Sequence, residues 1–232
     1  MITLSLDTTA QTASAAIVRD DKLLCQYSLA SGNTHSVTLL PMVKHMLEMT
    51  GLTTKDIDLY SVCAGPGSFT GLRIGVATVK GLAFADNTPC IAVSSLEAMA
   101  ENLKCLNGII CPVINARRSQ VYTALFKSEN GAITRLTEDA TLLINELEEQ
   151  LREYDNVWFT GDAYEMVSHM TNNTTPLLLR DFNAVGAAYV GIRHYLEAED
   201  KSVFNDTLLQ PVYLKKTQAE REREERMSRE AN

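Results

Sequence analysis

The first thirty residues alternate short apolar runs with polar turns. Residues 2–7 alternate apolar and polar side chains and end at Asp7, which predicts a strand. Residues 14–18 and 23–29 predict two more strands, separated by the polar turn 19–22. Because a turn this short joins neighbouring strands that run in opposite directions, we expect the sheet to begin with antiparallel pairing.

The next segment has the pattern of a long helix. Asn33 or Thr34 can cap its first amides, and Gly51 is a suitable end. Pro41 lies inside this segment. Since proline lacks an amide donor and clashes with the preceding turn, we expect a kink there or a helix that begins nearer Thr38.

The rest of the chain alternates between predicted strands and helices. Strands are predicted at residues 59–64, 89–93, 109–115, 120–126, 157–160 and 177–178. Helices are predicted at residues 70–85, 95–106, 142–154 and 184–198. This order predicts an α/β protein of two lobes, each a mixed sheet flanked by helices, with residues 1–102 in the first lobe and 103–232 in the second.

The first predicted helix carries a wide apolar arc. On a wheel of residues 37–49, the arc covers about 180° and contains Met49, Met42, Met46, Leu39, Val43, Leu47 and Leu40. A helix that packs on one sheet needs a stripe of only about 100°. We therefore predict that the edge formed by the three methionines binds another surface, because methionine suits adaptable contacts. The alternative is that the second lobe covers this edge.

The second predicted helix carries small residues at positions that allow another helix to approach closely. These residues are Gly71, Gly75, Ala77, Gly81 and Ala85. A glycine inside a helix costs roughly 0.8–1 kcal/mol relative to alanine. We expect close packing or a backbone contact to offset that cost.

Composition and charge narrow the class of protein. Hydrophobic residues make up 45% and charged residues 22% of the 232 residues, as in an ordinary globular protein. No apolar run approaches the roughly 20 residues that cross a bilayer, and the first residues lack the pattern of a signal peptide. We expect a cytoplasmic protein with no membrane contact. The formal net charge of −8 repels phosphate backbones, so any nucleic acid is expected to be held by a partner.

The most informative motif is the glycine-rich segment 64–75, which reads AGPGSFTGLRIG. It lies between a predicted strand and a predicted helix, where backbone amides can approach an anion. It is neither a P-loop nor a dinucleotide fingerprint, because the lysine of the first and the glycine spacing of the second are missing. Taken alone, the motif does not identify a ligand.

The string GPGSFTGLRIG closely resembles the signature of the TsaB (YeaZ) family, which is related to TsaD and to the actin, sugar-kinase and heat-shock-chaperone ATPase superfamily. The resemblance continues at residues 7–9, 35–36, 40–41, 92–96, 116–118, 121–122, 160–162 and 210–214. One departure is Asn115, where the family usually has an acidic residue. The resemblance implies two actin-like (ribonuclease H-like) lobes and a subunit of the bacterial machinery that makes threonylcarbamoyladenosine in tRNA.

The resemblance further implies a partner subunit rather than the enzyme. TsaD carries two metal-binding histidines four residues apart, and the matching positions here are Ser95 and Met99. Neither side chain replaces an imidazole ligand. We therefore expect no catalytic residue, no bound metal and no required cofactor. The expected partners are a TsaD-like catalytic subunit, a TsaE-like ATPase and a second copy of this chain when it is free, with tRNA contacted only indirectly.

In TsaB-like proteins the first two helices form the surface used for homodimers and for pairing with TsaD. The interface residues predicted on this basis are His35, Leu39, Met42, Val43, Met46, Met49, Phe69, Gly71, Arg73 and Ile74.

The alternative function is that of a small ATP-dependent phosphotransferase or ATPase. Superfamily enzymes hold ATP phosphates with an acidic residue and a glycine-rich hairpin after the first strand. Asp7 stands in that place, but residues 8–13 contain no glycine. Weak nucleotide binding is the most we expect. Its candidate residues are Asp7, Thr8, Thr9, Gly65 and Gly67.

The sequence allows two roles for each of two charged segments. From Thr217 onward the chain is almost wholly Arg and Glu, which allows ion pairs on an exposed helix. This tail is either solvated, or docked on a partner or on the first lobe. The basic pairs Arg117–Arg118 and Lys215–Lys216 either contact tRNA or a partner, or are solvated surface.

Overall fold

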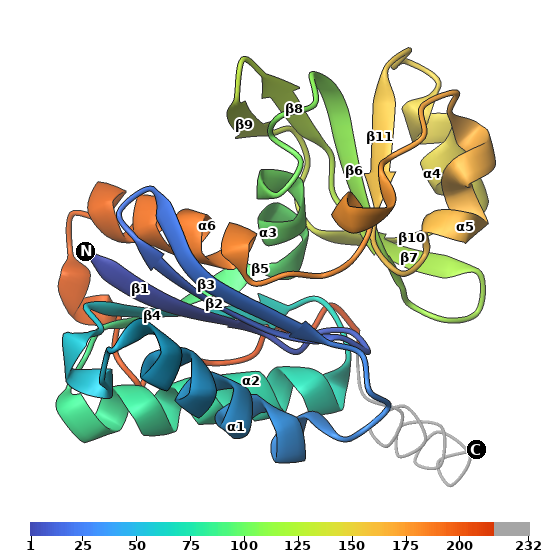
Figure 1. The fold of residues 1–232 in the computed structure, drawn as a ribbon. Coiled ribbons are helices and arrows are strands. Elements are labelled where there is room, and N and C mark those ends of the chain that lie inside the picture. Colours follow the sequence, from blue (N-terminus) through green and yellow to red (C-terminus); the bar gives the residue numbers. More distant parts are fainter. Residues whose placement is uncertain (216–232) are drawn as a thin grey trace, which may run out of the picture.

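The computed structural model describes residues 1–215, arranged as two lobes (Figure 1). The Arg- and Glu-rich tail and Lys216 lie outside the described residues. The first lobe is built on the strands β1 (Ile2–Asp7), β2 (Ala13–Arg19), β3 (Lys22–Leu29), β4 (Leu59–Gly65) and β5 (Cys90–Ser94). They lie in the order β3-β2-β1-β4-β5. The first three pair antiparallel and the last two join in parallel, which confirms the predicted mixed sheet.

Helices cover both faces of this sheet (Figure 1). The helices α1 (His35–Thr50) and α2 (Phe69–Asp86) lie on one face, and α3 (Ser95–Glu101) and α6 (Val185–Glu197) lie on the other. α1 begins at His35 rather than near Thr38, because the Nε2 of His35 bonds the Ala10 carbonyl at 2.8 Å and anchors the first turn. Gly51 ends it with a left-handed φ of 67°, as predicted.

The helix α6 returns from the second half of the chain to the first sheet. The Oγ of Ser5 donates to the Ala184 carbonyl at 2.6 Å, and the Oγ of Ser61 donates to the Ala187 carbonyl at 2.7 Å. The buried hydroxyls of Ser5 on β1 and Ser61 on β4 are therefore satisfied by this segment instead of by water. The predicted assignment of residues 103–232 to the second lobe needs a correction, because α6 belongs to the first.

The second lobe is a six-stranded sheet with two short helices on one face. Its strands are β6 (Gly108–Asn115), β7 (Gln120–Thr123), β8 (Phe126–Glu129), β9 (Ala132–Arg135), β10 (Ala140–Leu143) and β11 (Val157–Thr160). The order is β10-β7-β6-β8-β9, and β11 pairs with β6 in parallel. The helices are α4 (Ile144–Leu151) and α5 (Tyr164–Val167).

Sequence patterns were least informative in this lobe. The predicted strand 120–126 is two strands, because β7 pairs with the end of β6 at Asn115 and β8 pairs with its start at Ile110. The predicted strand 177–178 is part of a 3₁₀ turn, Leu177–Leu179. The four-residue strands β9 and β10 have no predicted counterpart, since so short a strand is defined by its neighbours more than by its own pattern.

Among residues 1–215, none of the helices has both the length and the apolar character needed to span a bilayer.

A cluster of charged side chains joins α3, α6 and β9. Arg193 contacts Glu97 at 2.9 Å and Glu101 at 2.8 Å, and Arg135 contacts Glu97 at 3.4 Å. Burial by itself raises the pKa of Glu97. Hydrogen bonds from His194 and Arg193 and the charge of Arg135 outweigh burial and lower this pKa to about 2.

The substitution Glu97→Gln is expected to lower the free energy of unfolding by about 1–2 kcal/mol at pH 7, less than for a fully buried pair because Arg193 is a third exposed. A carboxyl whose folded pKa is depressed stabilises the fold above its unfolded pKa, near 4.5, and loses this effect as the pH falls toward 2. Urea titrations should therefore show the difference between the variant and the parent shrinking across that range. A difference that stays constant with pH would contradict this role.

Candidate functional site

The helix α1 packs on its own sheet with most of the methionine edge turned inward. Leu39, Met42, Val43 and Met46 are buried in the core of the first lobe, and Met46 is 0% exposed. On the wheel these four span about 100°, the width that one sheet covers. The expectation that Met42 and Met46 form an exposed edge is therefore wrong, and Leu39 and Val43 belong to the core instead of to an interface.

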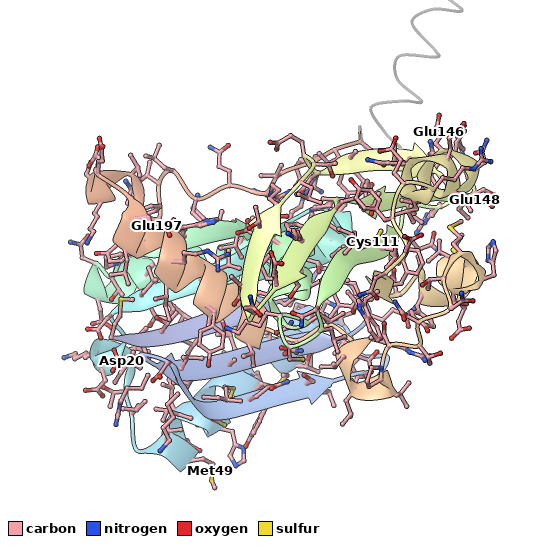
Figure 2. The ribbon with its side chains drawn as sticks, turned by 90° about the horizontal axis from the view of Figure 1, so that it is seen from above. Asp20, Met49, Cys111, Glu146, Glu148 and Glu197 are labelled. Carbon is pink, nitrogen blue, oxygen red and sulfur yellow. The ribbon has the colours of Figure 1, made fainter. Side chains whose placement is uncertain are left out.

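The apolar surplus of α1 lies on both sides of this buried stripe. Met49 is 69% exposed and points away from the body of the molecule (Figure 2), while Val37 is 66% and Leu40 is 51% exposed. The neighbouring helix α2 adds Phe84, which is 76% exposed. We call Val37, Leu40 and Phe84 the α1–α2 face, whereas Met49 lies on the other flank of α1, beyond the buried stripe. Both helices run in the same direction, so Met49 and Phe84 lie toward the same end (Figure 1).

The glycines of α2 make two different kinds of contact. A Cβ on Gly71 would overlap the carbonyl oxygen of Thr8, and one on Gly75 would lie 2.5 Å from the Thr8 hydroxyl oxygen. These two glycines therefore admit the chain's own Thr8, not another helix, and the buried Gly71 is unavailable to a partner. A Cβ on Gly81 would meet nothing within 4 Å.

The remaining predicted residues on α2 hold the end of the described chain. Phe69 stacks on Tyr213 with ring centroids 5.0 Å apart, and the Nε of the exposed Arg73 donates to the Tyr213 hydroxyl at 3.0 Å. Ile74 is half-buried and packs against the core of the first lobe. Sequence analysis missed Phe84. A helical wheel would have indicated it, because this large aromatic residue lies on the same side of the helix as the small residues Ala77 and Gly81.

Asp7 ends β1 but does not face the solvent. Its Oδ1 accepts the backbone N–H of Thr9 at 2.9 Å and the Thr9 hydroxyl at 2.7 Å. Burial raises the pKa of this carboxyl, and the two bonds from Thr9 offset part of that rise. The hydroxyl of Thr8 donates to the Gly71 carbonyl at 2.7 Å. The Oδ1 of Asp7 and the hydroxyls of Thr8 and Thr9 thus fix the turn and attach it to α2, whereas the Oδ2 of Asp7 is buried without a hydrogen-bond partner in the described part of the chain.

The glycine-rich loop is filled by the chain's own backbone. A Cβ on Gly65, where φ is 137°, would overlap the Val212 carbonyl oxygen, and one on Gly67 would lie 2.7 Å from the Thr9 carbonyl oxygen. The N–H of Ser68 donates to that same Thr9 oxygen at 2.7 Å. The need for glycine at both positions follows from these close approaches and requires no bound phosphate.

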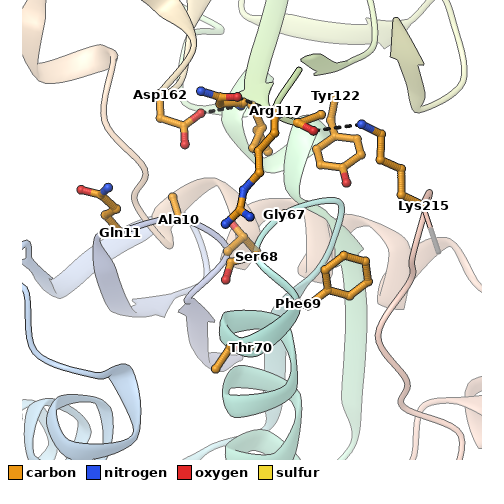
Figure 3. Close-up of a pocket in the computed structure, with 14 residues that line it drawn as sticks. Ala10, Gln11, Gly67, Ser68, Phe69, Thr70, Arg117, Tyr122, Asp162 and Lys215 are labelled. Atoms are coloured by element: carbon orange, nitrogen blue, oxygen red, sulfur yellow. Dashed lines mark hydrogen bonds between the residues drawn. The ribbon is translucent and has the colours of Figure 1, made fainter. Parts of the chain in front are cut away.

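A cleft of about 510 Å³ lies between the lobes beside this loop (Figure 3). Two of the candidate nucleotide-binding residues, Thr9 and Gly67, line it, whereas Asp7, Thr8 and Gly65 do not. Arg117 reaches into it from the second lobe toward the Ser68 side (Figure 3). The other lining residues are Ala10, Gln11, Phe69, Thr70, Ile114, Asn115, Ala116, Tyr122, Asp162 and Lys215.

Asn115 organises the second-lobe wall of the cleft. Its backbone N–H donates to the Asp162 carboxylate at 2.7 Å, and its side-chain oxygen accepts the backbone N–H of Arg117 at 2.8 Å. Arg117 and Arg118 both adopt left-handed φ values, 63° and 54°. The amide at position 115 thus shapes the turn that carries Arg117. The cleft offers hydrogen-bond donors and one carboxylate to a polar molecule.

The positions that match the TsaD histidines belong to the protein core. Ser95 and Met99 are both buried on α3. Within residues 1–215, no three His, Cys, Asp or Glu side chains come together as a set that could bind a metal ion.

Comparisons with known proteins agree with this architecture. The model of the TsaD family, tRNA N6-adenosine threonylcarbamoyltransferase, matches residues 29–221. The chain is 37% identical over 162 residues to the tRNA threonylcarbamoyladenosine biosynthesis protein TsaB of Bacillus subtilis, which covers 69% of this chain and 71% of the relative. It is 30% identical over 219 residues to the protein of the same name from Escherichia coli, with 91% and 94% covered.

A solved structure extends the likeness to the whole fold. YeaZ from Pseudomonas aeruginosa, at 26% identity, superposes with a TM-score of 0.77 over 92% of this chain and 99% of that one. Sequence signature, family match and fold therefore agree, and the chain belongs to the TsaB (YeaZ) family, with its actin-like fold, within the wider group that the TsaD model describes.

Proposed function

We propose that this chain takes part in the synthesis of threonylcarbamoyladenosine in tRNA as a non-catalytic subunit that binds a TsaD-like transferase. The relatives from B. subtilis and E. coli are named for this biosynthesis, and the chain spans 71% and 94% of their lengths. In this role the transfer step belongs to the partner. The chain favours the competent conformation of that partner by binding it more tightly than other conformations.

The observation that carries the proposal is the α1–α2 face. Its three large apolar side chains are more than half exposed on two adjacent helices. Large exposed apolar side chains on adjacent helices favour an interaction site, and the open space at Gly81 lets a partner helix come close. A shallow groove on the same side of α1 is lined by Leu40, Pro41, Lys44, His45 and Glu48. We assign this surface to the TsaD-like partner and, in its absence, to a second copy of this chain.

The packing of the candidate nucleotide-binding residues supports a non-catalytic role. Backbone atoms of Val212 and Thr9 lie against Gly65 and Gly67, and Asp7 accepts a hydrogen bond from its own turn. The names of the relatives do not favour the ATP-dependent phosphotransferase. Calorimetry of the isolated chain with ATP and magnesium separates the two functions. Tight binding with turnover would favour the phosphotransferase, whereas weak or absent binding together with tight capture of a TsaD-like subunit would favour the partner role.

A TsaE-like ATPase completes the proposed assembly. The net charge of −8 favours contact with tRNA through partners instead of directly. The cytoplasm is the location we propose for an assembly that modifies tRNA.

The substitution Phe84→Asp is expected to weaken binding of a TsaD-like subunit by roughly 30-fold or more, the effect of losing about 2 kcal/mol at a central aromatic residue. The melting temperature should stay near that of the parent, since this side chain is 76% exposed. Isothermal titration calorimetry measures the affinity, and sedimentation measures self-association. Leu178→Asp, at an 88% exposed position in the second lobe, is the control and should bind normally. Parent-like affinity of Phe84→Asp would place the interface elsewhere.

A further inference from the structure

The two lobes are joined by two chain connections and by α3, whose Leu96 and Met99 share one buried cluster with Ile110 of the second sheet. Residues 102–107 lead from α3 to β6, and residues 180–184 lead back from the second lobe to α6. These connections touch each other, because the side-chain amide of Asn102 donates to the Asn183 carbonyl at 3.3 Å. We call these connections, together with α3, the hinge, and a rotation of one lobe against the other would turn about it.

A later segment crosses the lobes at a different edge. We call residues 212–215 the strap. The N–H of Val212 donates to the Ala64 carbonyl at 2.7 Å, which ties the strap to the end of β4. Tyr213 stacks on Phe69 at 5.0 Å between ring centroids, at an interplanar angle of 27°. The first half of the strap is therefore attached to the first lobe beside the glycine-rich loop.

The second half of the strap is attached to the second lobe. Leu214 is half-buried against the cluster of the second sheet and α3. The Nζ of Lys215 donates to the Ala116 carbonyl at 2.9 Å and to the Gln120 side-chain oxygen at 2.7 Å (Figure 3). Ala116 and Gln120 flank the β6–β7 turn, which carries Arg117. The strap thus reaches across to the wall of the cleft from which Arg117 extends.

We propose that the strap locks the two lobes at one angle and so sets the width of the cleft. An additional attachment at another edge opposes rotation about the hinge. The lobes then behave as one rigid body, which reduces the conformational entropy lost when a partner binds. This inference concerns the isolated chain and stands or falls separately from the proposed partner.

The test compares two substitutions of matched chemistry. The double variant Tyr213→Ala with Lys215→Ala removes both ends of the strap. The control, Tyr195→Ala with Lys201→Ala, removes the same two residue types within the first lobe, where the Nζ of Lys201 lies 4.8 Å from the Tyr195 ring centroid. Hydrogen exchange of the isolated proteins, followed by mass spectrometry, reports the opening of the cleft. Small-angle X-ray scattering reports the spread of the lobes.

In the strap variant, amides at residues 67–70 and 115–117 are expected to exchange roughly tenfold faster, as for the loss of about one net hydrogen bond. The radius of gyration should rise, and the control should match the parent in both measurements. If the double variant does not fold, the same two measurements are made on Lys215→Met, which keeps the aliphatic stem and removes the ammonium group. Exchange and scattering equal to the parent in the folded variant would overturn the proposal.

Discussion

Replacing Met46 with glutamate is expected to lower the free energy of unfolding by at least about 4 kcal/mol, the largest effect of any single change considered for this chain. Met46 is 0% exposed and packs with Leu39 and Val43 in the core of the first lobe. A carboxylate there would be buried without a partner. The fold must then either bury the charge or keep the acid protonated.

That choice gives the Met46→Glu variant a pH signature. A buried acid has a raised pKa in the folded state, so the unfolded chain releases its proton more readily. Stability of the variant relative to the parent should therefore fall as the pH rises from about 4 to 7. Urea unfolding followed by circular dichroism at several pH values measures this loss.

Met49→Glu is the matched control on the same helix. Because Met49 is 69% exposed, its free energy of unfolding should stay within about 0.5 kcal/mol of the parent. Equal stability of the two variants would mean that the methionine edge is not buried in solution, and the assignment of the core would fail.

Replacing Gly71 with alanine is expected to cost about 3 kcal/mol of unfolding free energy, even though alanine is the better helix former by about 1 kcal/mol. The new Cβ would overlap the carbonyl oxygen of Thr8. That carbonyl cannot move away easily, since the Thr8 hydroxyl donates to the Gly71 carbonyl and Thr9 is bonded to Asp7. The clash therefore outweighs the gain in helix propensity.

Gly81→Ala in the same helix is expected to have the opposite sign. Its Cβ would meet nothing within 4 Å, so the variant should gain about 0.8–1 kcal/mol. Thermal unfolding of the two variants side by side measures the contrast. If both changes stabilise the protein, Thr8 does not approach α2 as closely as the structure has it.

Much of the fold was predictable because the information is local. The strand that ends at Asp7 and the helix that ends at Gly51 follow from alternation, helical periodicity and a terminal glycine. The second lobe was less predictable. β7 and β8 read as one apolar run, and only the pairing of each with a different part of β6 divides them.

The candidate site was likewise predictable only in part. The glycine-rich segment stood out in the sequence, but its purpose depended on residues distant in the chain. Gly65 is required by Val212, Gly67 by Thr9 and Gly71 by Thr8. No spacing in the sequence predicts those contacts. A helical wheel of α2 could have indicated Phe84, which lies on the exposed side with Gly81.

The sequence by itself determined the family of this chain, its two α/β lobes and the excess of apolar surface on α1. Only the tertiary structure decided which part of that surface is buried. Periodicity sets the angles between side chains around a helix, but not the rotation of the helix against its sheet. That rotation comes from packing against strands, and here it turned Met42 and Met46 inward and left Val37, Leu40 and Met49 outside.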